Sequence, residues 1–473
     1  MSPSADPTAR SLADELRAWP ADRLAALLRD RPDLAVPIPE DLTALATRVS
    51  SRVSVQRALD GLDTPALQVV EVLAALPEPT APGAVTRRWG SPAAPQLARL
   101  RDLALVWGPP RGIRLVRTVR DVLGPHPAGL GPPLAEALDR RSPQRLAQLL
   151  TDLGLPPAAD PETALTGLSA HLGDPGTVRS LLDTAPDGVL ALLDRLTWGP
   201  PVGRVADADR PIGPDTMHRP VDWLLAHGLL AVADNAHLVL PREVGLVLRD
   251  GRVHRSPEPS PPSLSGPTRS TARVVGAATG TAAEAVRLVD ALGALLGAAP
   301  VPVLRSGGLG VRDLRRIATA LDVPESAAAR LTEIARAAGL IGTDQETDPH
   351  WAPTPAFDMW RTGTPGQRWA DLTEAWLATS RVPGLVGTRD EKDTPRQALG
   401  PGLDRAEAPE LRRRILRVLA DAPAPDGQCA APGPEPVRAY VDWARPRRAG
   451  RARDALIGWT LDEASWLGVT GAG

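Results

Sequence analysis

The chain has 473 residues, of which 43% are hydrophobic and 23% charged, enough to form several buried cores. Its 54 basic and 56 acidic residues leave a net charge of −2, which excludes a basic signature over the whole protein. Cys429 is the only cysteine, so an internal disulfide framework and a multi-cysteine zinc site are also excluded.

The first segment has no basic-then-apolar leader, because acidic residues such as Asp14 and Glu15 interrupt it. No apolar run approaches membrane-spanning length. We therefore expect a soluble, cytoplasmic protein without a membrane partner.

The N-terminal residues 1–62 are predicted to form a helical lead-in of short amphipathic helices. A unit over residues 63–123 follows, and Asp63-Thr64-Pro65 is a favourable helix start. We expect three helices there and then a β-hairpin, whose turn is Gly-Pro-Pro-Arg-Gly at 108–112. This order is typical of a winged helix.

Residues 124–185 are predicted to be a helical connector, and residues 186–250 a second winged-helix-like unit. In that unit we expect helices at 189–196 and 219–227, a strand at 228–232 and a return strand at 237–240. Residues 251–281 include SPEPSPPSLSGPTRS, whose composition is typical of an extended linker between two halves of the chain.

The stretch 282–362 gives the strongest structural signal. Apolar residues at helical spacing predict a helix at 282–296 and two further helices that meet across the turn Val323-Pro324-Glu325. Gly339 is well placed to end the last helix, and Leu340-Ile341 with His350-Trp351-Ala352 predict a hairpin. The sequence therefore predicts a winged helix-turn-helix.

Residues 363–408 are expected to form a helical connector and loop. Residues 409–473 are predicted to be an incomplete winged-helix-like unit, with a strand starting at Trp466-Leu467-Gly468-Val469. The fold class that follows is mainly α with small β-hairpins, arranged as tandem winged-helix units.

No catalytic motif stands out. A phosphate-binding loop needs glycines followed by Lys and Ser or Thr, but Lys392 is the only lysine and lies in RDEKDTP. We interpret the glycine cluster at 306–313 as a structural turn, and the acids Asp462 and Glu463 as the first turn of a helix. The histidines show no metal-ligand spacing. We expect no catalytic residue, metal or cofactor.

Local charge is more informative than net charge. Residues 84–120 hold eight arginines and one acid, Asp102, and residues 411–453 hold ten arginines and four acids. Arginine suits phosphate contacts through its planar fork. Our candidate nucleic-acid-binding residues are Arg87, Arg88, Arg99, Arg101, Arg111, Arg114, Arg117, Arg445, Arg447, Arg448 and Arg451. The alternative is that these arginines are ordinary solvated surface residues, because arginine supplies all the basic residues of this chain except one lysine.

Three segments, LRSGGLGVRDLRRIA at 304–318, LTEIARAAGLI at 331–341 and DEASWLGVTG at 462–471, carry a family resemblance. With them the chain resembles bacterial helicase-associated proteins with XPB/Ssl-type helicase N-terminal domains. The resemblance implies a protein of several winged helices related to accessory regions of XPB-type repair and transcription helicases. It also implies a further domain beyond the WLGVTG segment, which this chain lacks.

The leading hypothesis is a non-catalytic, helicase-associated protein that binds the DNA backbone, in DNA repair or transcription, with a helicase or repair protein as partner. A protein-interaction scaffold of winged-helix units is the alternative, favoured by the balanced charge of the 282–362 unit. A DNA helicase, as the family label suggests, is the remote alternative, because the phosphate-binding lysine is missing.

Overall fold

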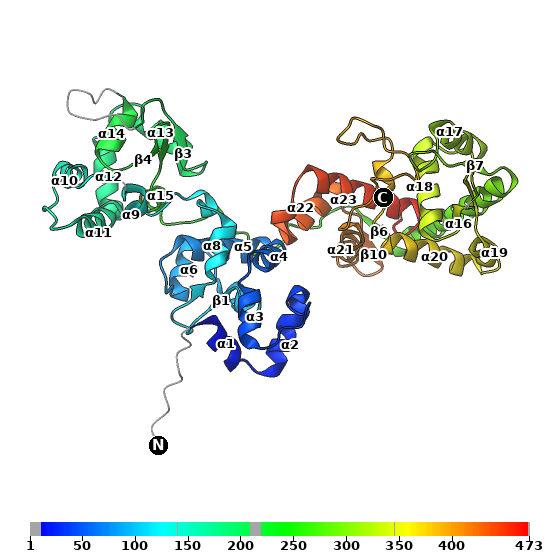
Figure 1. The fold of residues 1–473 in the computed structure, drawn as a ribbon, viewed down its shortest axis with the longest axis horizontal. Coiled ribbons are helices and arrows are strands. Elements are labelled where there is room, and N and C mark those ends of the chain that lie inside the picture. Colours follow the sequence, from blue (N-terminus) through cyan, green and yellow to red (C-terminus); the bar gives the residue numbers. More distant parts are fainter. Residues whose placement is uncertain (1–10, 140, 209–218, 345, 472–473) are drawn as a thin grey trace, which may run out of the picture. The chain divides into compact units, whose positions relative to one another are not determined.

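The computed structural model describes residues 11–471 except 140, 209–218 and 345. The chain divides into two compact units, Met1–Ser260 and Pro261–Gly473, so the division lies inside the Ser/Pro-rich segment. The described residues are mainly helical with small antiparallel sheets, which confirms the mainly-α prediction (Figure 1).

The first unit contains short helices and two small sheets. Its helices are α1 (Leu12–Ala18), α2 (Ala21–Asp30), α3 (Leu42–Val49), α4 (Arg52–Asp60), α5 (Thr64–Ala75), α6 (Pro82–Trp89), α7 (Ala94–Asp102), α8 (Arg117–Leu123), α9 (Leu134–Leu138), α10 (Pro143–Asp152), α11 (Pro161–Leu172), α12 (Pro175–Asp183), α13 (Val189–Thr197), α14 (Pro220–Ala226) and α15 (Arg242–Leu248). Its strands are β1 (Val106–Trp107), β2 (Arg114–Leu115), β3 (Val202–Arg204), β4 (Ala231–Asp234) and β5 (His237–Val239).

The second unit repeats this mixture with longer helices. Its helices are α16 (Thr271–Ala298), α17 (Val311–Ala320), α18 (Glu325–Ala337), α19 (Pro355–Arg361), α20 (Pro365–Ala378), α21 (Ala408–Ala420), α22 (Pro434–Ala444) and α23 (Arg451–Trp466). Its strands are β6 (Thr268–Ser270), β7 (Val301–Pro302), β8 (Ile341–Thr343), β9 (His350–Pro353) and β10 (Gln428–Ala430).

In the described part of the lead-in, α1 to α3 pack around a small core that includes Leu16 and Leu27, whereas the buried apolar residues of α4 belong to the core of the module that follows. Arg31 is buried among these helices, and its guanidinium donates to the carbonyls of Leu103 and Val49 and to Ser54 Oγ. Burial lowers the pKa of Arg31 to about 10, with the nearby Asp33 opposing the shift. This arginine fastens the lead-in to the segment that follows α7.

The module formed by α5, α6, α7, β1 and β2 follows the predicted element order. Asp63 caps α5 by accepting a hydrogen bond from the backbone of Ala66, as its position before Thr64-Pro65 predicts. The strands β1 and β2 pair antiparallel, and a bridge between Thr80 and Ile113 adds a third extended segment beside them. The helices enclose a core in which Trp89 is fully buried and donates its indole N–H to Gln68.

Residues 134–248 form a second core within the first unit. The helices α9 to α12 of the predicted connector contribute to this core together with α13, α14 and the sheet β3-β5-β4. The connector is therefore part of a folded domain and not a spacer. The strand predicted at 228–232 begins only at Ala231, because Gly228, Leu229 and Leu230 form the turn that ends α14.

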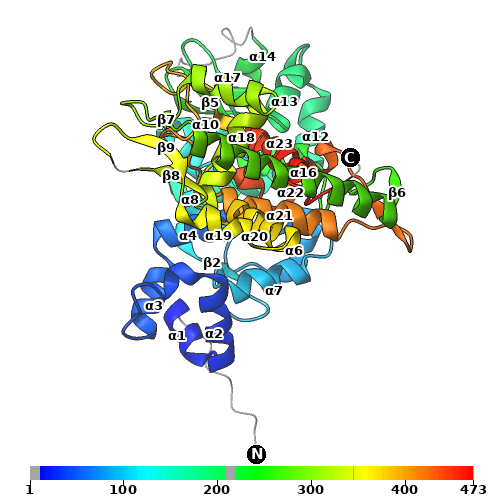
Figure 2. The ribbon, with the colours of Figure 1, turned by 90° about the vertical axis from the view of Figure 1, so that its right-hand side faces the viewer.

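In the second unit α16, α17, α18 and the sheet β7-β9-β8 form the module predicted at 282–362. The first helix is longer than expected, because α16 already begins at Thr271, where Ser270 caps it. The predicted linker 251–281 is therefore wrong at its C-terminal end, where the Ala- and Thr-rich residues 271–281 are helical. Helix α20, from the predicted 363–408 connector, packs on α16 and α18 (Figure 2).

The last part of the chain, α21 to α23, also departs from the prediction. No strand begins at Trp466, because α23 continues through that residue and 467–470 are turns. The strand β10 instead pairs antiparallel with β6, so that Cys429 lies opposite Arg269. The strand of this part of the chain thus pairs with β6, which precedes α16, and not with a strand at the C-terminal end.

Candidate nucleic-acid interface

The arginines of α7 form ion pairs within the first unit. Arg99 bonds to the carboxylate of Asp63, the residue that caps α5. Arg101 donates to Glu15 Oε1 of α1 at 2.9 Å and to the carbonyl of Gly108 at 2.7 Å. Glu15 is buried and also accepts the backbone N–H of Gly108 at 2.6 Å. The two candidates on the third helix therefore already have carboxylate partners.

Arg120, which belongs to the same charge cluster, closes the C-terminal end of α5. Its guanidinium donates to the carbonyls of Leu73, Ala74 and Leu76 and to Glu78 Oε1 at 2.8 Å. Cations stabilise the unpaired carbonyls at a helix C-terminus. The role of Arg120 is therefore structural.

The other arginines of this module have no acidic partner among the described residues. Arg111, in the hairpin turn, and Arg117, at the start of α8, are exposed, as is Arg87 in the last turn of α6. Arg114 lies over the ring of Trp107 with 5.7 Å from its Cζ to the ring centroid. Arg88 donates to the carbonyl of Gly251.

The acids of residues 64–120 are in contact with cations or a histidine. Glu78 pairs with Arg120, Asp102 pairs with Arg23 of α2 at 3.0 Å, and Glu71 lies 3.3 Å from His254 Nε2. Asp121, four residues after Arg117 on α8, is exposed and outside these pairs, so the hairpin and its flanking helices expose more positive than negative charge. This is the part of the predicted cluster that remains available to a phosphate backbone.

The second cluster is more strongly committed to internal contacts. Arg445 pairs with Glu410 at 2.6 Å, and Arg448 lines a small cavity of about 10 Å³ that Glu407 and Glu410 also line. Arg453 is buried and donates to the carbonyls of Arg445 and Val441. Of the four candidates here, Arg451 is exposed, whereas Arg445, Arg447 and Arg448 are half-buried.

Helix α18, the third helix of the 282–362 module, is covered by its own unit. Seven of its 13 residues are buried, among them the polar Thr332 and Glu333. Glu333 accepts hydrogen bonds from Arg381 Nε at 2.6 Å and Nη2 at 3.0 Å, and from the backbone N–H of Leu399. Residues from the following segment thus cover a face of α18, which limits its access to a DNA groove.

Helices α14 and α23, of the 186–250 and 409–473 segments, also pack against neighbouring elements. Five of the seven residues of α14 are buried, and α23 packs against α16, α21 and α22. Glu463 of α23 accepts the indole N–H of Trp376 at 2.6 Å and pairs with Arg412 at 3.2 Å in the interior. Burial raises the pKa of Glu463, although Arg412 opposes the shift. Glu463 lies near the C-terminus of α23, which ends at Trp466. The expectation that Asp462 and Glu463 form the first turn of a helix was therefore wrong.

Sequence reasoning did not anticipate the pairs Glu333–Arg381 and Glu463–Arg412. Each joins residues from separate helices or loops, 48 and 51 positions apart. Nothing in the local spacing signals such pairs, because a charged residue in an amphipathic helix is normally exposed. The only local hint is that Glu333 lies between the apolar residues Leu331 and Ile334 of α18, both of which are buried.

The glycine cluster at 306–313 is a structural turn, as expected. Gly308 has a φ of +94°, and a Cβ atom there would lie 2.8 Å from the backbone of Gly400. The N–H of Leu309 donates to the carbonyl of Ala398 at 2.7 Å. Tight packing against 398–400 fills the space that a phosphate would need.

No family model, curated protein or solved structure matches this chain. Within the described residues, no three His, Cys, Asp or Glu side chains are grouped so that they could hold a metal ion. None of the described helices combines the length and apolar character needed to cross a membrane.

Proposed function

We propose that the chain is a non-catalytic DNA-binding protein that contacts the phosphate backbone through the module at 63–123. In this proposal the order α5, Thr80 bridge, α6, α7 and hairpin is a winged helix, and the modules at 186–250 and 282–362 are its variants. The observation that carries the proposal is the set of arginines without acidic partners at 87, 111, 114 and 117. They lie around a hairpin near which Glu71, Glu78 and Asp102 are already in contact with other side chains and only Asp121 is exposed.

Backbone contact is favoured over base reading. A helix that reads bases must enter the major groove with several side chains free. Helix α18, the third helix of the 282–362 module, is largely buried, as is α14 of the 186–250 module, and Arg99 and Arg101 of α7 are ion-paired. Exposed arginines in a hairpin and at helix ends can still position a duplex through its phosphates.

The resemblance to helicase-associated proteins supports a role beside a helicase in repair or transcription. For unwinding, a protein that holds DNA without hydrolysing nucleotides needs a nucleotide-hydrolysing partner. In this chain Lys392 lies in a loop in which its N–H donates to Asp390, and no glycine loop precedes it. We therefore propose a helicase or repair protein as the partner.

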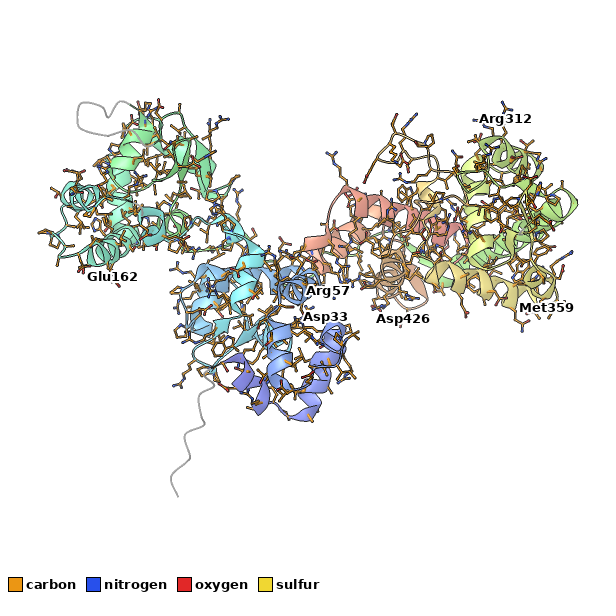
Figure 3. All side chains as sticks on the ribbon, in the orientation of Figure 1. Asp33, Arg57, Glu162, Arg312, Met359 and Asp426 are labelled. Atoms are coloured by element: carbon orange, nitrogen blue, oxygen red, sulfur yellow. The ribbon has the colours of Figure 1, made fainter. Side chains whose placement is uncertain are left out.

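Titration of duplex DNA at two salt concentrations tests the proposal. The wild type should bind with weak sequence selectivity and lose affinity as salt rises, because phosphate contacts release counterions. The double variant Arg111→Gln, Arg117→Gln should bind more weakly and lower the salt slope by about 2, roughly one for each contact. Arg312 of α17 and Arg273 of α16 are exposed arginines of the other unit (Figure 3 labels Arg312), and changing both to Gln is the matched control. Equal slopes for the two double variants would refute the proposal.

A protein-interaction scaffold is the second candidate. The observation that favours it is the burial of α18, since a winged helix that packs its third helix internally acts through other surfaces. Under this hypothesis neither double variant changes DNA affinity. Absence of DNA binding at both salt concentrations, together with a stable complex formed with a protein partner, would support it.

A further inference from the structure

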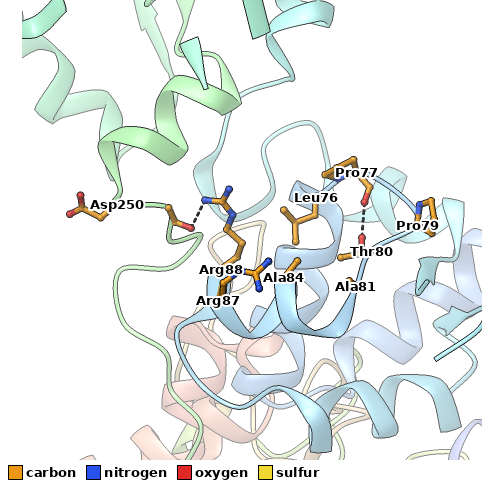
Figure 4. Close-up of a pocket in the computed structure, with 10 residues that line it drawn as sticks. Leu76, Pro77, Pro79, Thr80, Ala81, Ala84, Arg87, Arg88 and Asp250 are labelled. Carbon is orange, nitrogen blue, oxygen red and sulfur yellow. Dashed lines mark hydrogen bonds between the residues drawn. The ribbon is translucent and has the colours of Figure 1, made fainter. Parts of the chain in front are cut away.

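A cavity of about 550 Å³ lies beside α6 in the first unit (Figure 4). One side of it is apolar, formed by Leu76, Pro77, Pro79 and the alanines 81 and 84. The other side carries the guanidinium groups of Arg87 and Arg88. A cavity of this size matches small-molecule sites, which combine an apolar wall with a few polar groups.

The position of Arg88 is fixed by the segment that follows α15. Its Nη1 donates to the carbonyl of Gly251 at 3.0 Å, and its own carbonyl accepts the N–H of Val253 at 2.9 Å. Gly251 has a φ of +78°, and a Cβ atom there would lie only 2.7 Å from Arg88 Nη1. Glycine at 251 thus allows the close approach that holds this guanidinium at the edge of the cavity.

The cavity has an excess of positive charge. Neither Arg87 nor Arg88 is in an ion pair within the described part of the chain. Burial and then the charge of Arg87 lower the pKa of Arg88, so two unneutralised cations lie next to each other. The one acid in the lining, Asp250, pairs with Arg179 at 3.3 Å and points away from both arginines (Figure 4).

We propose that this cavity binds an organic phosphate monoester, with the phosphate on Arg87 and Arg88 and the carbon skeleton on the Leu76–Pro79 wall. A monoester carries close to two negative charges, which matches two guanidinium groups. The ligand is either a free nucleotide or the 5′-phosphate at the end of a DNA strand. The inference shares Arg87 with the proposed backbone contact, but Arg111 and Arg117, which the DNA titration tests, do not line this cavity.

Isothermal titration of the full chain with adenosine 5′-monophosphate is the test. The wild type should show saturable binding, whereas adenosine and inorganic phosphate should each bind at least tenfold more weakly. Arg87→Gln should raise the Kd about tenfold or more, as expected for the loss of a charge-assisted hydrogen bond. Arg87 is exposed and unpaired, so this variant should fold. Arg88→Lys keeps the charge and should have a smaller effect than Arg87→Gln.

Arg57→Gln, at an exposed arginine of α4 outside the cavity, is the matched control and should leave the Kd unchanged. Oligonucleotides with a 5′-phosphate or a 5′-hydroxyl distinguish the two sources. Preference for the phosphorylated end identifies a strand end, and equal binding of both identifies a free nucleotide. Lack of saturable nucleotide binding by the wild type would overturn the inference, as would inorganic phosphate binding equally tightly or equal Kd values for Arg87→Gln and Arg57→Gln.

Discussion

Helices α7 and α18 occupy the same place in two modules of the same element order, yet they are buried to different extents. In α7, Leu97 and Leu100 are the buried residues of nine, whereas seven of the 13 residues of α18 are buried. The lead-in contacts α7 through a few polar side chains at its C-terminal end, while residues 381–399 cover α18 and bond to its Glu333. Element order alone therefore does not decide which surface of such a module is free.

The difference comes from the segments outside the modules. Helices α1 to α3 have a small core to which Ala104, just after α7, also belongs, and the ion pairs Arg23–Asp102 and Glu15–Arg101 join them to α7 itself. In the segment after α20, Val382 and Leu385 belong to the core of α21 to α23, whereas Ala398 and Leu399 belong to the core of α18. The module of α7 thus lies beside a neighbouring segment, whereas residues of the segment after α20 complete the core of the module of α18.

The largest effect is expected from Glu333→Ala on α18. Glu333 is 2% exposed, and its removal leaves Arg381 and the N–H of Leu399 without their acceptor. Loss of one partner of a buried pair costs about 3–5 kcal/mol. Denaturant unfolding with hydrogen exchange on α18 measures it. Glu325→Ala is the control on α18. It breaks an exposed pair with Arg315 of α17 and should cost less than about 1 kcal/mol. Similar losses for both variants would show that 381–399 do not hold α18.

A smaller effect is expected from Glu15→Ala in the lead-in. Glu15 accepts from Arg101 and from the N–H of Gly108, and hydrogen bonds that involve a charged group contribute about 1.5–3 kcal/mol. Faster amide exchange in the hairpin 106–115 would report the loss. Asp14→Ala, which removes an exposed pair with Arg17, is the control. An unchanged hairpin would mean that the lead-in does not stabilise the module.

The smallest effect is expected from Arg99→Gln on α7. Its pair with Asp63 is partly exposed, so stability should change by less than about 1 kcal/mol. Because the pair competes with phosphate, the salt slope of DNA binding should change less than for Arg111→Gln. Salt-dependent titrations of the two single variants compare them. A larger change in salt slope for Arg99→Gln would make α7 the main contact with DNA. The third helix of this module would then lie close to the bases, in contrast to the buried α18.

Local sequence signals predicted much of the fold. The helices at 311–320 and 325–337 and the hairpin after Gly339 follow from apolar spacing and from helix-ending residues, which depend on near neighbours. Gly339 does adopt a positive φ of +70°. The arginine clusters were also visible, because charge can be counted along the chain. Their pairing was not, since Arg101 finds Glu15 86 positions away.

Segments with ambiguous composition were predicted less well. Trp466-Leu467-Gly468-Val469 looks like a strand because a short apolar run does not distinguish a strand from a buried helix. In the structure α23 is buried on several sides, and its apolar residues continue to its end. The Ala- and Thr-rich start of α16 is likewise ambiguous, because Gly276 and Gly280 weaken its helical pattern.

The ladder between β6 and β10 has a consequence for how the second unit forms during synthesis. Ser270 and Gln428, which pair in this ladder, are 158 positions apart. On a ribosome, the first strand of the unit emerges long before its partner exists, and closing so distant a contact is slow. Until then β6 has no strand partner, but its three polar residues, Thr268–Ser270, form too short an edge to favour self-association of the nascent chain.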